Sequence, residues 1–348
     1  MIVLSAPLRV MLPSRVFIPQ PPNPEQEDIF SSGLGALFTD DTQNSHGIPG
    51  QTVVYTSPRY GEIKLGIPQH PDVEEGRKLF AHYLWNAGVV AADAVEVASN
   101  TGSHDESPAG KVVWNKKYWD FGNQDVLELG AGTALPSLVA ALSSARSITI
   151  TDHPSSPAIV NDTIALNAKT NLYEADSDTV KPRACAEVAI HGLTWGDDHF
   201  TSSTHYGKLA DPQPAKHSFD KIIVADCLWM PSQHVNLVKT INSYLRLESH
   251  ESRKVPCALV VAGFHTGRSI VSRFFEIATG SRTGKAEGKE MVNDEEDEEV
   301  REVKGLLDAA EIFEVDVDCN VRDWLPERRD ESKEQAKRWV VCAAIVRR

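Results

Sequence analysis

The residues whose types and spacing point to chemistry lie between Val126 and Asp152. A short apolar run that contains Glu128 ends at Gly130-Ala131-Gly132, and a second apolar run ends at Asp152. Glycines after a strand leave backbone N–H groups open to a ligand, because no Cβ stands in the way. A carboxylate about 20 positions further on, at the tip of the next strand, is placed to hold the two hydroxyls of a ribose. The pattern predicts a nucleoside-binding site.

Position 135 separates this pattern from the fingerprint of dinucleotide-binding proteins. That fingerprint has a third glycine, whereas this chain has Leu135. A leucine there keeps the helix further from the first strand, which favours a ligand without a pyrophosphate over NAD.

The elements that must position these residues are predicted from apolar periodicity and turn residues. A hairpin is expected at 52–65, before the first long helix at 79–97. Fully apolar runs such as 219–226 are typical of strands covered by helices on both faces. The predicted strands are 126–129, 148–151, 184–190, 219–226, 258–262, 312–317 and 339–346, and the predicted helices between them include 158–168, 235–247 and 269–278.

The E-x-G-x-G pattern at Glu128 with Asp152 downstream resembles the class I S-adenosylmethionine-dependent methyltransferases. LFAHYLWNAG at 79–88 and Asp226-x-x-Trp229 resemble the branch that contains fungal nicotinamide N-methyltransferase-like proteins and the protein N-terminal and lysine methyltransferases of a translation elongation factor. The resemblance covers most of residues 79–346. It implies an α/β, Rossmann-like fold with a seven-stranded sheet and an antiparallel C-terminal strand.

The resemblance also implies the site. S-Adenosyl-L-methionine is expected to contact Trp85, Glu128, Gly130, Ala131, Gly132, Asp152, Trp195 and Ala225. Asp226 at the tip of its strand, or a nearby backbone carbonyl, could orient the acceptor amine, and Asp226 is the expected catalytic residue. An aromatic plane at Trp195 offers stacking to a purine. Plainer alternatives stay open: a core tryptophan at position 85, a turn tryptophan at 195, and a helix cap at 226. His234 is expected to be an ordinary polar residue near a helix start.

Two positions depart from the family pattern. His153 stands where the family usually has tyrosine, and Trp229 stands where many members have tyrosine or phenylalanine. The first should affect adenosine packing more than chemistry, and the second leaves the substrate open.

Composition limits the partners. The 35 basic and 49 acidic side chains give a net charge of −14, which argues against direct nucleic-acid binding and favours a basic protein partner. The five cysteines are scattered without a C-x-x-C pair, as expected for free thiols in a reducing compartment and no metal site. No apolar run approaches the roughly 20 residues that span a bilayer. A cytoplasmic monomer without membrane contact is therefore expected.

Two regions are predicted: an N-terminal extension or cap at 1–75, and a methyltransferase domain at 76–348 with an acidic loop at 280–302. The run 294–299 in that loop is acidic throughout. Such a run is typical of a solvated loop, and the alternative is a docking segment for a basic protein.

The predicted function is N-methylation of a protein, at a lysine or an N-terminal amine, with a translation elongation factor as one candidate acceptor. The alternative is a small-molecule N-methyltransferase of the nicotinamide type, which should enclose its substrate under a closed lid. A third hypothesis is a binding module that has kept only the fold. The intact set of Glu128, Gly130, Gly132 and Asp152 argues against it.

Overall fold

The computed structural model describes residues 12–19, 44–69, 83–100, 111–173, 184, 186–201, 203–206, 213–248, 254–280 and 297–348. The first four residues of the helix expected at 79–97 and most of the expected acidic loop lie outside these residues. Within them, no helix is long and apolar enough to cross a membrane.

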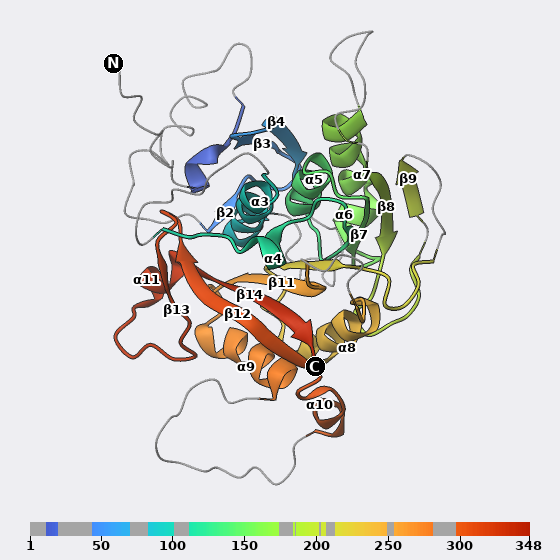
Figure 1. Ribbon diagram of the computed structural model, residues 1–348. Coiled ribbons are helices and arrows are strands. Elements are labelled where there is room, and N and C mark those ends of the chain that lie inside the picture. The colour runs from blue at the N-terminus through green and yellow to red at the C-terminus, as the bar shows by residue number, and fades with distance from the viewer. Residues whose placement is uncertain are drawn as a thin grey trace, which may run out of the picture.

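A central sheet organises the fold (Figure 1). Among the described residues it has nine strands in the order β13-β12-β14-β11-β10-β6-β7-β8-β9. The five in the middle are parallel, and β14 runs antiparallel between β11 and β12. Their bounds are β6 Asp125–Leu129, β7 Ser147–Asp152, β8 Glu187–Gly192, β9 Ser203–Tyr206, β10 Lys221–Ala225, β11 Cys257–Gly263, β12 Leu307–Asp316, β13 Val321–Asp323 and β14 Trp339–Arg347.

The seven strands and the antiparallel C-terminal strand expected from the sequence are confirmed. The sheet is wider than expected because β9 and β13 add one short antiparallel strand at each edge. Neither short strand carries a residue of the predicted site.

Helices cover both faces of the sheet because the central strands are apolar on both sides. On β10, Ile223 joins the core beneath α3 (Asn86–Ala98) and α5 (Leu135–Leu142), whereas Ile222 and Val224 join the core beneath α8 (His234–Tyr244) and α9 (Arg268–Thr279). The remaining helices are α4 Lys116–Trp119, α6 Pro157–Val160, α7 Thr163–Ala168, α10 Glu298–Val303 and α11 Lys333–Lys337, with short turns η1 Leu12–Arg15, η2 Lys169–Tyr173 and η3 Pro231–Gln233.

Two predicted helices differ from the structure. The first begins at Asn86 because Leu84–Trp85 form strand β5, which pairs with β2 (Ser45–His46). The helix expected at 158–168 is interrupted at Asp162, whose φ of 54° is left-handed, so that α6 and α7 are separate. Apolar spacing alone did not reveal either break.

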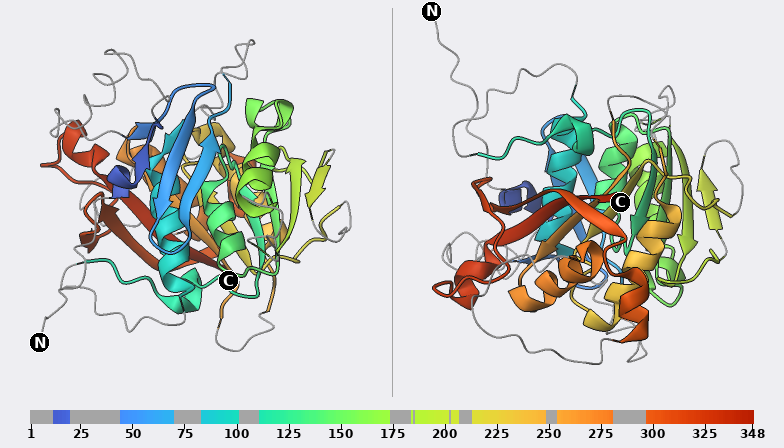
Figure 2. Two further views of the ribbon diagram at one scale, coloured as in Figure 1. Left: turned by 90° about the horizontal axis from the view of Figure 1, so that it is seen from above. Right: turned by 60° about the horizontal axis from the view of Figure 1, so that its bottom comes forward.

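The predicted hairpin is confirmed as β3 (Thr52–Ser57) and β4 (Gly61–Gly66), with β1 (Val16–Phe17) beside β3. Figure 2 shows the hairpin on the same face as α3 and α5. Asn167 of α7 holds both backbone groups of Gly66, accepting from its N–H at 2.7 Å and donating to its carbonyl at 3.1 Å. Arg15 forms a buried ion pair with Asp93 of α3 at 2.9 Å. The described part of the N-terminal segment is therefore packed against the sheet domain.

The C-terminal part of the expected acidic loop is helical in the structure. Asp297 caps α10 by accepting a hydrogen bond from the Glu299 N–H at 3.3 Å. Acidic residues in the first turn suit the positive end of the helix dipole, and Val300 and Val303 are buried. Residues 298–302 therefore do not belong to a loop, and residues 281–296 lie outside the described part of the chain.

Candidate functional site

The carboxyl ends of β6, β7, β8 and β10 meet at one edge of the sheet, where open α/β sheets place their ligands. A cavity of about 200 Å³ lies there. All nine residues predicted from the sequence line it: Trp85, Glu128, Gly130, Ala131, Gly132, Asp152, Trp195, Ala225 and Asp226. Their positions thus converge on one space, and their roles toward a ligand stay predictions.

The loop after β6 is glycine-rich for a steric reason. Gly130 and Gly132 have φ values of 66° and 53°, which side-chain-bearing residues rarely adopt. A Cβ on Gly130 would lie 2.8 Å from Cys227 Sγ and 3.1 Å from Trp195 Cζ2. The backbone of this loop consequently forms part of the cavity wall.

Asp152 links the tip of β7 to that loop. Its Oδ2 accepts a hydrogen bond from the Gly132 N–H at 2.8 Å, and its Oδ1 accepts one from the His153 N–H at 2.7 Å. Burial raises the pKa of Asp152, and the two backbone hydrogen bonds oppose this. The Ser156 side chain also hydrogen-bonds to this carboxylate, and because a carboxylate offers about four acceptor sites, capacity remains for a ligand hydroxyl.

Glu128 lies at the end of β6, fully enclosed. Its Oε2 has no hydrogen-bond partner among the described residues, and burial raises its pKa to about 8. A buried acceptor without a partner is costly, so a ligand that donates a hydrogen bond there would relieve the cost.

Asp226 follows β10 in a left-handed backbone conformation, with φ 59°. Its N–H donates to the Val261 carbonyl at 2.7 Å, and its Oδ1 accepts from the Gly263 N–H at 3.1 Å. Burial raises the pKa of Asp226, and the neighbouring His265 opposes this. Asp226 caps neither η3 nor α8, whose cap residues are Met230 and Gln233, so the helix-cap alternative is wrong. A strained residue at a sheet edge is typical of functional sites.

The two predicted tryptophans are half-buried on the cavity wall. The Trp85 ring stacks on His265, with centroids 4.7 Å apart and planes at 14°. Trp195 lies beside Gly130 and packs partly against the core. The core-tryptophan alternative fits Trp114 and Trp119, which are fully buried, and does not fit Trp85.

His234 does not line the cavity. Its Nε2 lies 2.9 Å from the Leu228 carbonyl oxygen, and burial lowers its pKa. This is the structural role that the sequence indicated for a histidine near a helix start.

Sequence reasoning missed His265, which lies two residues after β11 at the same edge of the sheet. Its place after the fifth predicted strand was the available signal. Tyr83, Thr133, Cys227 and Met230 also line the cavity. In the part of the chain that the structure describes, no group of three or more histidine, cysteine or carboxylate side chains is arranged to hold a metal ion.

The sequence of this chain is similar to a protein family and to several named proteins. The family model described as lysine methyltransferase matches residues 72–279. Curated relatives carry the name protein N-terminal and lysine N-methyltransferase EFM7. The relative from Gibberella zeae is 36% identical over 175 residues, which are 49% of this chain and 55% of that protein. The relative from Candida glabrata is 30% identical over 236 residues, covering 66% of this chain and 75% of that protein.

Coverage varies among these relatives. The relative from Neurospora crassa is 28% identical over 292 residues, covering 80% of this chain and 88% of that protein. With the relatives from Kluyveromyces lactis and Gibberella zeae, the chain spans only about half the length of the protein it matches. Among solved structures, an arsenic(III) S-adenosylmethionine methyltransferase from Chlamydomonas reinhardtii aligns over 73% of each chain at 12% identity and a TM-score of 0.34.

Proposed function

Because the chain belongs to the lysine methyltransferase family, we propose that it transfers a methyl group from S-adenosyl-L-methionine to an amine nitrogen of a protein, at a lysine side chain or an N-terminus. One observation supports this most. Residues from separate segments, from Trp85 to Asp226, line a single cavity at the carboxyl edge of a parallel sheet.

The cavity offers groups that suit each part of the donor. The Asp152 carboxylate, which already accepts two backbone N–H groups, has acceptor capacity left for a ribose hydroxyl, and Glu128 Oε2 is a buried acceptor without a partner among the described residues. Glycine at position 130 lets Cys227 and Trp195, two other lining residues, pack against the loop where a Cβ would collide with them. Trp195 provides an aromatic plane for adenine. When bound, the donor supplies a methyl group already activated by a sulfonium.

The protein's own task is then to present an uncharged amine. A lysine has a reference pKa near 10.4 and an N-terminal amine near 8, so each must lose a proton first. Asp226, enclosed at the tip of β10, is the carboxylate that would orient this amine. Most of the rate enhancement should come from positioning and from exclusion of water.

The acceptor is proposed to be a basic protein, with a translation elongation factor as the candidate that the sequence resemblance named. The net charge of −14 supports a basic partner. The relatives' name, which specifies protein N-terminal and lysine methylation, supports a protein amine over a small molecule. Cytoplasmic location and a monomeric state remain predictions.

Incubation with tritium-labelled S-adenosyl-L-methionine and a methyl-deficient cell lysate tests the proposal. A discrete labelled protein band is expected. Asp226→Asn should lose the band and keep its affinity for the donor, because Asp226 is assigned to the acceptor. Label found only in the small-molecule fraction would select the nicotinamide-type alternative, and label nowhere would reject both activities.

A further inference from the structure

His265 has no part in the function proposed so far, although it lies beside two of the site residues. It follows β11, whose register pairs Val261 with Ala225 of β10. This pairing brings the residues after both strands to the same edge. His265 is one-fifth exposed, and the Asp226 side chain beside it is nearly enclosed.

The histidine faces the carboxylate. His265 Nδ1 lies 3.9 Å from Asp226 Oδ2, while the other oxygen, Oδ1, accepts from the Gly263 N–H at 3.1 Å. A Cβ on Gly263 would come within 3.2 Å of His265 Nδ1 and 3.7 Å of Asp226 Oδ1. A side chain at 263 would therefore crowd the imidazole beside the carboxylate.

The same imidazole supports the cavity wall. Its ring stacks on Trp85 at a centroid distance of 4.7 Å, and Tyr83 meets Trp85 edge-on at 5.7 Å. One side chain thus contacts a residue assigned to the donor and faces a residue assigned to the acceptor.

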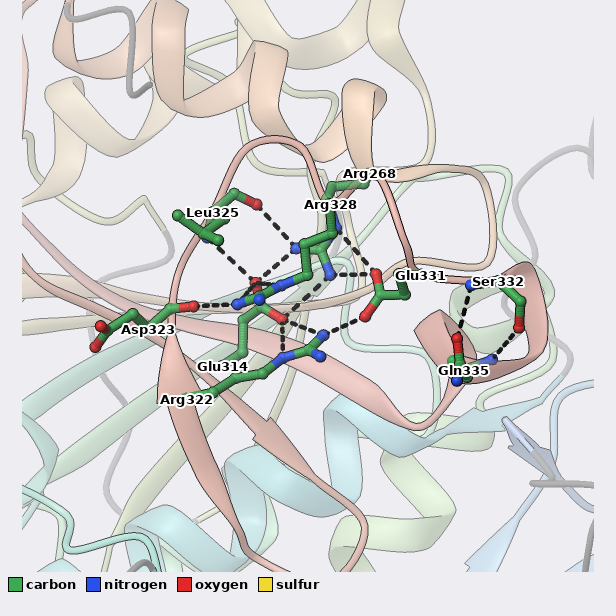
Figure 3. Close-up of polar contacts among 9 residues, drawn as sticks. All are labelled: Arg268, Glu314, Arg322, Asp323, Leu325, Arg328, Glu331, Ser332 and Gln335. Atoms are coloured by element: carbon green, nitrogen blue, oxygen red, sulfur yellow. Dashed lines mark hydrogen bonds and ion pairs between the residues drawn. The ribbon is translucent and has the colours of Figure 1, made fainter. Parts of the chain in front are cut away.

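A buried charge cluster fixes the segment that carries His265. Arg268, three residues further on, donates to both oxygens of the fully buried Glu314, at 2.6 and 3.2 Å, and to Glu331. Figure 3 shows Arg322 and Arg328 completing the cluster around Glu314. The Arg268 guanidinium also lies 3.9 Å from the Phe264 ring centroid. The backbone on either side of His265 is therefore held on the strand pair β12–β13.

A much smaller hollow of about 10 Å³ shares Trp85 and Asp226 with the main cavity. Its lining includes Trp85, Asp226, Gly263, His265 and Lys337. This volume is close to that of one water probe. The titratable groups that line it are Asp226, His265 and Lys337. The thiol of Cys227, next to Asp226, stays neutral because burial raises its pKa.

We propose that His265 is a positioning residue of the transferase site: its imidazole holds the Asp226 carboxylate in the orientation that faces the acceptor amine, and its ring face fixes Trp85. The effect on turnover rests on the proposed function. The contact between the two side chains does not.

The contact is measured without any activity, by NMR of the histidine side chains in the full chain at one fixed pH. The chain has 12 histidines, and the resonance of His265 is assigned by its loss in His265→Gln. In Asp226→Asn this resonance should shift, because the group that faces the imidazole has changed, whereas in His199→Gln it should not. A His265 resonance that stays unchanged in Asp226→Asn overturns the proposal.

Kinetic measurements separate the contact of His265 with Asp226 from its contact with Trp85. They also test the proposal if Asp226→Asn does not fold. His265→Phe keeps a ring on Trp85 and removes the ring nitrogen that faces Asp226, so kcat/KM for the acceptor should fall about tenfold with unchanged donor affinity. His265→Gln should weaken donor binding as well. The control is His199→Gln at an exposed histidine, which should match the wild type. If kcat/KM of His265→Phe equals that of the wild type, the proposal is overturned. If the wild type is inactive but the His265 resonance responds to Asp226→Asn, only the proposed function is rejected.

Discussion

Replacing Gly130 by alanine should both strain the fold and distort the wall of the donor site. Gly130 has φ 66°, a conformation that costs a non-glycine residue about 1–2 kcal/mol. The new Cβ would also lie 2.8 Å from Cys227 Sγ and 3.1 Å from Trp195 Cζ2, and overpacking adds about 1–3 kcal/mol. The sum is a loss of about 2–5 kcal/mol in the free energy of unfolding.

Gly61→Ala is the matched control. Gly61 has a similar φ of 74°, but a Cβ there would meet nothing within 4 Å. It should therefore cost only the backbone part, about 1–2 kcal/mol, and leave donor binding intact. The difference between the two variants isolates the crowding at the cavity wall.

Urea denaturation gives the two stabilities, and calorimetry with S-adenosylhomocysteine gives the affinities. Gly130→Ala should lose measurable binding while Gly61→Ala keeps it. Adding Cys227→Ala to Gly130→Ala should recover part of the stability, because Sγ is the nearest obstacle. If Gly130→Ala bound the ligand as tightly as Gly61→Ala does, the loop after β6 would not be part of the donor site.

Three further predictions concern other residues. Burial raises the pKa of Glu128 to about 8 from 4.5, so its contribution to stability is present below pH 4.5 and is lost as pH rises toward 8, up to roughly 5 kcal/mol. Denaturation at pH 5 and 8 should show this loss in the wild type and not in Glu128→Gln. If the free energies of unfolding of the two proteins differed by the same amount at both pH values, the assignment to Glu128 would be wrong. Trp195→Ala should weaken donor affinity by about 1–3 kcal/mol, as measured by calorimetry. Unchanged affinity would mean that this tryptophan packs against the protein and does not stack on the donor. Asp93→Ala should destabilise by about 3–5 kcal/mol in urea denaturation, because Arg15 is left buried and unpaired; a loss below 1 kcal/mol would show that the N-terminal segment does not depend on this pair.

Sequence-local features placed the loop after Glu128 and Asp152 together because each of them ends a predicted strand, whereas Trp85 and Trp195 came from the family resemblance. The apolar run to Leu129 followed by Gly130, and the run to Thr151 followed by Asp152, are signals within a few residues. Once the strands are parallel and adjacent, their carboxyl ends must meet at one edge. No knowledge of distant contacts was needed for that inference.

What the sequence did not reveal depends on distant partners. Leu84–Trp85 continue the apolar spacing of a helix, yet they form a strand because Ser45–His46 pair with them. His265 gains its neighbours from the register of β10 against β11 and from the stacking on Trp85. Glu314 and Arg268 are 46 positions apart in the chain. Periodicity and turn residues carry no information on such pairs.

The most direct test of the account is donor binding to Asp152→Asn. Each oxygen of Asp152 accepts a hydrogen bond from a backbone N–H group. An amide at this position would therefore turn its NH₂ group toward one of these N–H groups and would remove an acceptor for the ribose. Calorimetry with S-adenosylhomocysteine should give one site per chain in the wild type and an affinity weaker by roughly tenfold or more in the variant, a difference of at least about 1.4 kcal/mol. Equal affinity in the two proteins would mean that the cavity between β6 and β7 does not hold the nucleoside, and the assignment of the site would fail.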